Sequence, residues 1–411
     1  MDSKGQFLII IAILLLPLNA FAEGNIRIGR IQIHPGLGYE LTHDSNIFKE
    51  SERERADFIH TLRPGVLAKY QGDGDNFLMA SYDLGAIRYA EYTDNDYIEH
   101  NGMISGLYRT PVGFYGRFDN IFSHTADPLG SSNSYRENDP KVRRWFNEGV
   151  LGLGYERNRL RVEANYGNHY ERYLENEDSW QNRNDHQYGL LGYYRILPRT
   201  SLLAQYRLTD INYTNQNNGD NTRGIDGDTS QDALFHQFFI GLNFDPTGKV
   251  NGELKLGIGH KDYVNDKDWN DEEYEDVTTW LAETDLDWAM SAKTKFNVKF
   301  SRSLKDSTES YATRFTTTAF GLGVRHTFFE QFTAYASSGY SLDEYDNTSS
   351  TLDSRHDKTF TAATGIEYQF KNWIKDWLTI GLGYNFENRV SNFDDEEFKD
   401  HRTTLNFLAA F

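Results

Sequence analysis

Two short segments combine the side-chain types of a hydrolytic site. Ser123 is followed by His124, and Ser354 lies close to His356 and Asp357. A serine nucleophile needs a histidine base and a carboxylate in one geometry, and adjacency along the chain does not provide it. The chain has no Cys, no His-Glu-x-x-His spacing and no phosphate-binding loop. We therefore expect no enzymatic activity and no cofactor, and a barrel hydrolase built on a Ser-His pair is the alternative.

Carboxylates are a second group of chemically capable residues, because they gather in polar segments. Asp220, Asp226 and Asp228 lie in one such segment, and acidic runs occupy residues 266–276 and 394–400. Carboxylate oxygens suit a hard cation such as Ca²⁺, but the spacing does not match an EF-hand. Acidic runs are usually solvated surface. The sequence predicts no metal site, and it leaves calcium binding or ion bridges to lipopolysaccharide phosphates as open hypotheses.

The elements that position these residues follow from an alternation of apolar and polar side chains with a period of two. The alternation is clearest in residues 160–166, 296–300 and 377–386. Its runs last about 10 to 14 residues, close to the length of a tilted strand that crosses a membrane. Glycines two residues apart recur on the polar side, as in Gly152-Leu153-Gly154-Tyr155. We expect these inward glycines to let the strands curve and twist.

The connections between these runs alternate between short and long. Eight short turns and nine long polar segments predict about 18 strands, with 16 as the alternative. In bacterial outer-membrane barrels the tight turns are periplasmic and the long loops are external. The predicted fold class is therefore all-β: a transmembrane, antiparallel, up-and-down β-barrel.

The start of the chain predicts export. Lys4 precedes an apolar run from Phe7 to Leu16 and a small-residue ending at Ala22, so residues 1–22 are predicted to be a cleaved signal peptide. The run is short for a membrane span, and an uncleaved anchor is the alternative. Residues 23–411 then form a single barrel domain, placed in the outer membrane of a Gram-negative bacterium after Sec-type export.

Composition supports this assignment and narrows the partners. The net charge of −19, without a concentrated basic face, excludes nucleic acid as an expected partner. Aromatic residues make up 15% of the chain. Tyr and Trp at strand ends, such as Trp280 and Trp288, are expected to form the two interfacial girdles of a membrane barrel.

Assigning the polar side of each run to the barrel interior predicts the residues that line the lumen. They are Arg63, Lys69, Asp83, Arg117, Asp119, Arg161, Glu163, Arg207, Glu253, Lys255, Glu283, Asp285, Asp287, Lys299, Arg325, Glu367 and Arg402. Nine basic and eight acidic side chains make a mixed wall that is not strongly ion-selective. These charges either act at a constriction, expected at residues 123–143 or 214–231, or pair with one another on the wall.

The last alternating run, residues 401–411, places Phe407 and Phe411 on its apolar side. A terminal Phe on such a strand resembles the assembly signal of outer-membrane barrel proteins. The resemblance implies the barrel-assembly machinery as a partner, in addition to outer-membrane lipid and lipopolysaccharide.

The N-terminal part of the predicted barrel resembles a known family. It contains Pro35-Gly36-Leu37-Gly38-Tyr39, Asp44-Ser45-Asn46-Ile47-Phe48 and Leu62-Arg63-Pro64-Gly65-Val66. These segments are similar to the start of outer-membrane β-barrel porins associated with exopolysaccharide biosynthesis and export loci. The resemblance implies a channel for exopolysaccharide or small solutes, with export components as partners and no catalytic residue. A non-conducting surface barrel whose long acidic loops bind or adhere is the alternative function.

Overall fold

The structure is a computed structural model, and it describes residues 26–126, 142–214, 230–245, 247–267, 273–307, 312–347, 354–370 and 377–410. The predicted signal peptide, Phe411 and the three aspartates Asp220, Asp226 and Asp228 lie outside these residues.

Eighteen long strands, each antiparallel to the next along the chain, form one sheet. They are β2 (Ile31–Asp44), β3 (Asp57–Gln71), β4 (Phe77–Tyr89), β5 (Tyr97–Arg109), β6 (Phe114–Ala126), β7 (Arg143–Arg157), β8 (Leu160–Tyr173), β9 (Arg183–Leu197), β10 (Thr200–Ile211), β11 (Ala233–Phe244), β12 (Val250–Tyr263), β13 (Val277–Ala289), β14 (Thr294–Asp306), β15 (Ala312–Phe328), β16 (Phe332–Asn347), β17 (His356–Gln369), β18 (Leu378–Ser391) and β19 (Phe398–Ala410). A three-residue strand, β1 (Ile26–Ile28), pairs with the start of β2.

Helical structure is limited to three short 3-10 turns in the described loops. These are η2 (Thr93–Asn95), η3 (Asn176–Gln181) and η4 (Asp394–Glu396). Among the described residues, no helix has the length and apolar character needed to cross a membrane.

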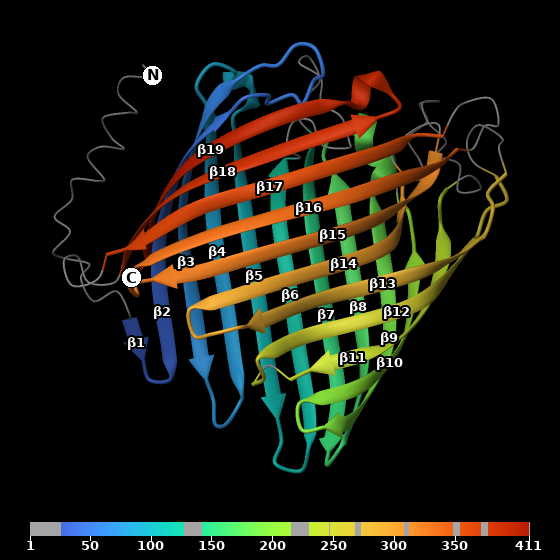
Figure 1. Cartoon of the computed structure of the whole chain (residues 1–411). Helices are drawn as coiled ribbons and strands as arrows, with labels where there is room; N and C mark the ends of the chain where they lie inside the picture. The colour runs from blue at the N-terminus through green and yellow to red at the C-terminus, as the bar shows by residue number, and fades with distance from the viewer. Residues whose placement is uncertain are drawn as a thin grey trace.

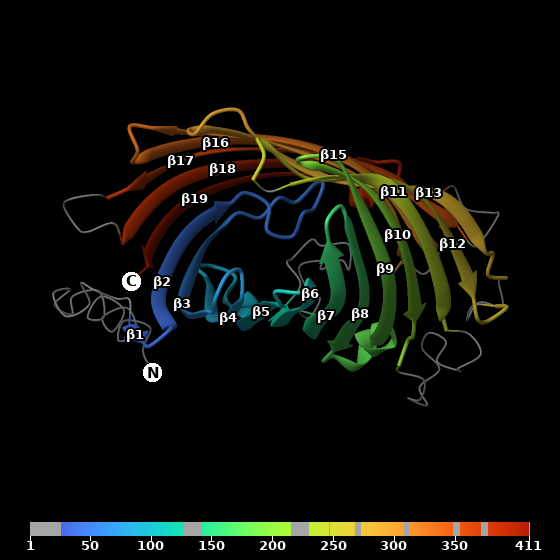
Figure 2. The same cartoon turned by 90° about the horizontal axis from the view of Figure 1, so that it is seen from below.

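Pairing of the last long strand with the first closes the sheet. On β19, Leu405 lies opposite Leu41 of β2, and Phe407 lies opposite Tyr39. Figure 1 shows β13–β19 crossing at a strong tilt in front of the steeper strands β4–β8, as expected for tilted strands in a barrel. Figure 2, seen from below, shows the strands curving around an interior. The predicted fold class and the count of 18 long strands are confirmed.

The predicted alternation of connections holds around most of the barrel but fails at two places: five residues, 307–311, separate β14 from β15, whereas eight residues, 370–377, separate β17 from β18. The short turns have local causes. Only Asn158 and Arg159 join β7 to β8, and Asn158 has a φ of 58°, which Asn tolerates better than most residues. The β5–β6 turn contains Gly113 with a φ of 103°. We call the long-loop end external and the short-turn end periplasmic, following the general topology of these barrels.

The outer face of the barrel is apolar. The side chains of Leu153, Leu190 and Ile240 are 62%, 61% and 59% exposed, which suits contact with lipid hydrocarbon. Trp280 and Trp288 share this exposed face, at 50% and 45%. The rings expected in the interfacial girdles therefore point away from the interior.

Candidate transport lumen

The charged side chains that alternate with the exposed apolar ones belong to the inner face. Arg117 on β6 lies 2.9 Å from Glu163 on β8, so the contact passes over β7. The concave side of a curved sheet brings such next-neighbour strands together. All seventeen charged residues expected in the lumen have this inner parity on their strands. Their part in conduction stays a prediction.

Most of these charges meet an opposite charge on a nearby strand. Arg63 lies 2.9 Å from Asp83 and also contacts Glu99. Further pairs are Arg207 with Glu283 (2.9 Å), Lys255 with Glu283 (2.6 Å), Arg325 with Glu367 (2.7 Å), Lys299 with Asp285 (3.1 Å) and Arg402 with Glu387 (3.1 Å). The wall is therefore polar, with its charges largely balanced.

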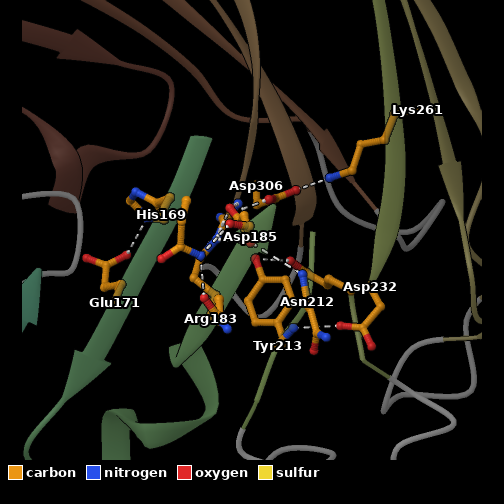
Figure 3. Close-up of polar contacts among 12 residues, drawn as sticks. His169, Glu171, Arg183, Asp185, Asn212, Tyr213, Asp232, Lys261 and Asp306 are labelled. Carbon is orange, nitrogen blue, oxygen red and sulfur yellow. Dashed lines mark hydrogen bonds and ion pairs between the residues drawn. The ribbon is translucent and has the colours of Figure 1, made fainter. Parts of the chain in front are cut away.

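One side of the lumen is narrowed by a polar contact across the barrel. Arg183 on β9 lies 3.1 Å from Asp306 on β14, five strands further along the sheet, and Lys261 on β12 contacts the same carboxylate. Asp185 holds the Arg183 guanidinium from its own strand at 2.5 Å. Figure 3 shows these side chains converging from the green, yellow and orange parts of the wall. The strands β9–β14 therefore form a lobe whose two sides are joined by side chains near the external end.

An apolar cluster fills this lobe. Its buried members are Ile211, Ala233, Phe235, Phe239, Tyr263 and Leu281. Burial of Tyr213 beside the cluster raises the pKa of its phenol well above the usual value. The backbone N–H of Tyr213 donates to Asp232 at 2.7 Å, and burial of Asp232 raises the pKa of its carboxyl. The contacts drawn in Figure 3 thus join the wall to the start of the β10–β11 loop.

A loop narrows the mouth from the opposite side. The β2–β3 loop buries Ile47 and Phe48, which are 3% and 4% exposed, against Val142 just before β7 and Tyr173 at the end of β8. Asn46 at the base of this loop is fully buried, and its amide donates to the carbonyl of Lys399 at 3.0 Å. Figure 2 shows the blue loop reaching from β2 and β3 over the interior. The segments expected to form the constriction lie largely outside the described residues, at 127–141 and 215–229.

A polar cavity of about 510 Å³ lies near the periplasmic end. Five arginines line it: Arg109, Arg159, Arg161, Arg195 and Arg199. Glu156 pairs with two of them, Arg109 at 2.8 Å and Arg195 at 3.3 Å. Hydrogen bonds from Thr247 lower the pKa of Asp245 in the β11–β12 turn, and this cavity's arginines add to the effect.

The residues of the Ser-His segments have other partners in the described structure. Ser123 and His124 are neighbours in strand β6, so their side chains leave opposite faces of the sheet. Ser123 donates to Asn101 at 2.8 Å, and the His124 ring packs on Trp145. Asp357 accepts hydrogen bonds from the buried Arg355 at 2.6 Å. In the described structure, Ser123 and His124 therefore make contacts within the wall, and Asp357 makes contacts at the external mouth.

Sequence reasoning missed the residues that narrow the lumen. Arg183, Lys261 and Asp306 lie at strand ends beyond the segments with the clearest alternation. Lys261 has the same parity as the predicted lumen residue Lys255, a signal that was available. Among the described residues, no group of His, Asp and Glu side chains is arranged to hold a metal ion. Phe407 points outward, with its ring centroid 6.2 Å from that of Tyr39.

Solved structures provide a comparison of folds. The outer-membrane protein OpdK from Pseudomonas aeruginosa is 8% identical over 92% of this chain and 99% of its own, with a TM-score of 0.46. OpdO from the same organism is 9% identical over 93% of this chain and 98% of its own, with a TM-score of 0.47. No curated protein sequence matches the chain.

A family match agrees with the closed barrel, the lipid-facing exterior and the polar interior. The family is described as Putative beta-barrel porin 2, and its profile matches residues 20–411. The chain therefore belongs to this family of outer-membrane β-barrel porins.

Proposed function

We propose that this porin passes exopolysaccharide or small hydrophilic solutes across the outer membrane. The observation that carries the proposal is the inner wall, where charges pair with one another and leave a polar surface of low net charge. Such a wall offers hydrogen bonds to sugar hydroxyls without holding a neutral solute by a strong field. Where Arg325 pairs with Glu367 on this wall, the guanidinium also lies 5.5 Å from the Tyr335 ring centroid.

The contacts that narrow the mouth favour a small or extended cargo. The Arg183–Asp306 contact and the buried β2–β3 loop reduce the space that a barrel of this strand number would otherwise leave open. A single extended sugar chain or a small solute fits this arrangement better than a folded protein. We expect the direction of passage to follow the concentration gradient of the solute, because the wall itself sets no direction.

Conductance of the purified chain in a planar lipid bilayer tests the proposal. We expect discrete current steps in KCl with weak ion selectivity, and reversible block when a neutral linear hexasaccharide is added. The second candidate is a non-conducting barrel that binds through its acidic loops, and the narrowed mouth favours it. Absence of steps from correctly folded protein would exclude the channel and support this second candidate.

A further inference from the structure

Five tyrosine–histidine pairs repeat around the outer face of the barrel. In each pair the tyrosine hydroxyl lies 2.7–2.8 Å from the histidine Nδ1. The pairs are Tyr39 with His60, Tyr82 with His100, Tyr166 with His186, Tyr206 with His236, and Tyr384 with His401. The ring centroids are 6.0–6.2 Å apart in all five, so one local geometry occurs five times.

All five pairs occupy the same height. Each joins the two strands of an external hairpin, and each histidine is the fourth residue of a strand that starts at the external end. At about 3.3 Å per residue and a tilt of about 45°, the fourth residue lies roughly 7 Å below the strand's start. Strands of 12 to 15 residues exceed the 9–11 or so that cross the hydrocarbon by a few residues shared between both ends, so this level lies at the boundary between the external headgroups and the hydrocarbon.

The pairs face the membrane. The tyrosines Tyr82, Tyr166, Tyr206 and Tyr384 are 38–43% exposed. The histidines share the parity of exposed apolar neighbours, as His60 does with Phe58, and His236 with Phe238. This ring of five pairs, which we call the histidine girdle, therefore meets the outer leaflet rather than the lumen.

The hydrogen bond prepares each imidazole to donate outward. We assign the phenolic O–H as the donor to Nδ1, because a phenol is the better donor and a neutral imidazole nitrogen the better acceptor. The proton of the neutral ring then resides on Nε2, on the far side of the ring from the tyrosine. Within the described part of the chain, these five Nε2 atoms have no protein hydrogen-bond partner. A belt of N–H donors is thus presented at the boundary between the headgroups and the hydrocarbon.

Charge on the same face favours an anionic acceptor at two of the five sites. Lys399 precedes His401 by two residues on the same face of β19, and Arg88, which also pairs with Asp96 at 3.5 Å, lies directly opposite His60 in the strand register. Asp210 lies opposite His186, so that site is expected to be the weakest. We propose that the histidine girdle binds the phosphate groups of lipid A in the outer leaflet.

Native mass spectrometry of the detergent-purified full chain tests this proposal. The probes are lipid A carrying both phosphates and the same lipid with its phosphates removed. The main variant replaces His60, His100, His186, His236 and His401 by Phe, which keeps a ring at each position. The matched control is His326→Phe, because His326 also faces outward but lies near the periplasmic end, where its Nδ1 is 2.9 Å from Thr294 Oγ1.

The wild type and the control should retain phosphorylated lipid A about tenfold more tightly than the five-histidine variant, the effect of losing a hydrogen bond to a charged group. Dephosphorylated lipid A should bind all three proteins equally weakly. Equal binding of the two lipids by the wild type, or full binding by the variant, would overturn the proposal. If the five-histidine variant does not fold, a variant with the five tyrosines replaced by Phe is measured instead. It should lose part of the preference for phosphorylated lipid A, because its histidines no longer receive the tyrosine hydrogen bond. An unchanged preference would contradict the proposal.

Discussion

At the scale of single residues, inward glycines make room for aromatic rings as well as for strand curvature. The Tyr115 ring covers Gly154 on the adjacent strand, while its hydroxyl donates to Glu163 at 2.9 Å. A Cβ at position 154 would overlap this ring. The repeated glycine pattern therefore has a packing role on the inner wall.

Replacing Gly154 by Ala should destabilise the barrel by about 1–3 kcal/mol, the usual effect of overpacking. Urea unfolding in detergent micelles measures the change. Gly192→Ala is the matched control, because no atom lies within 4 Å of a Cβ at that position. An equal effect at both positions would contradict the proposed ring contact.

Asp232 should make stability depend on pH. Burial raises the pKa of its carboxyl, and Asp210 and Asp185 add to the shift. A folded-state pKa above the unfolded value gives a contribution that is complete below the unfolded pKa, about 3.9, and is lost as pH rises through the folded pKa. Asp232→Asn keeps an acceptor for the Tyr213 N–H and should raise the thermal midpoint at neutral pH but not below pH of about 3.9. A pH-independent difference in melting profiles would argue against this cause.

At the scale of elements, the lumen is shaped by contacts between parts of the wall that are distant along the sheet. Strand β14 reaches β9 through Asp306, and the β2–β3 loop reaches the end of β8 through Phe48. Both contacts lie at the external end. The described mouth is therefore narrower than its strand number alone requires.

Asp306→Asn should cost about 3–5 kcal/mol, because the buried Lys261 and the partly buried Arg183 lose their shared carboxylate. Thermal or urea unfolding measures this cost. Asp285→Asn is the control, since the exposed pair of Asp285 with Lys299 should contribute at most about 1 kcal/mol. Similar losses of unfolding free energy in the two variants would show that the contact across the lumen stabilises the barrel no more than an exposed ion pair does.

Phe48→Ser should release the β2–β3 loop from Val142 and Tyr173 and so increase single-channel conductance. The phenyl ring is 4% exposed and packs edge-to-face with Tyr92, with ring centroids 5.4 Å apart. Planar-bilayer recordings give the step size. The exposed Phe58 on the lipid face, replaced by Ser, should leave conductance unchanged. A Phe48 variant with wild-type steps would place the constriction elsewhere.

At the scale of the whole molecule, the barrel separates three surfaces: an apolar exterior, a charge-balanced wall and an acidic set of external loops. The net charge of −19 is thus not a property of the wall, where arginine and lysine meet carboxylates pair by pair. Ion selectivity is expected to respond to any change that breaks this balance.

Arg63→Gln should shift the reversal potential towards cation selectivity, because it leaves Asp83 and Glu99 without their shared guanidinium. Bilayer measurements across a KCl gradient report the shift. Arg30→Gln, in an exposed pair with Asp73 at the β1–β2 turn, serves as control and should change selectivity less. An unchanged reversal potential in the Arg63 variant would show that Arg63 does not influence the permeating ions.

The sequence by itself determined which face each strand residue takes, because that depends only on the two-residue period along one strand. Thus the inward parity of Arg117 and the outward parity of Trp288 could be predicted, as could the number of strands from the alternation of turns and loops. Tertiary structure alone decided which residues meet across the interior. Arg183 and Asp306 are 123 positions apart and meet only because the closed sheet curves, and Phe48 finds Tyr173 only because its loop folds inward. The contacts across the interior and the position of the loop depend on the closure of the whole sheet, and no local pattern encodes them.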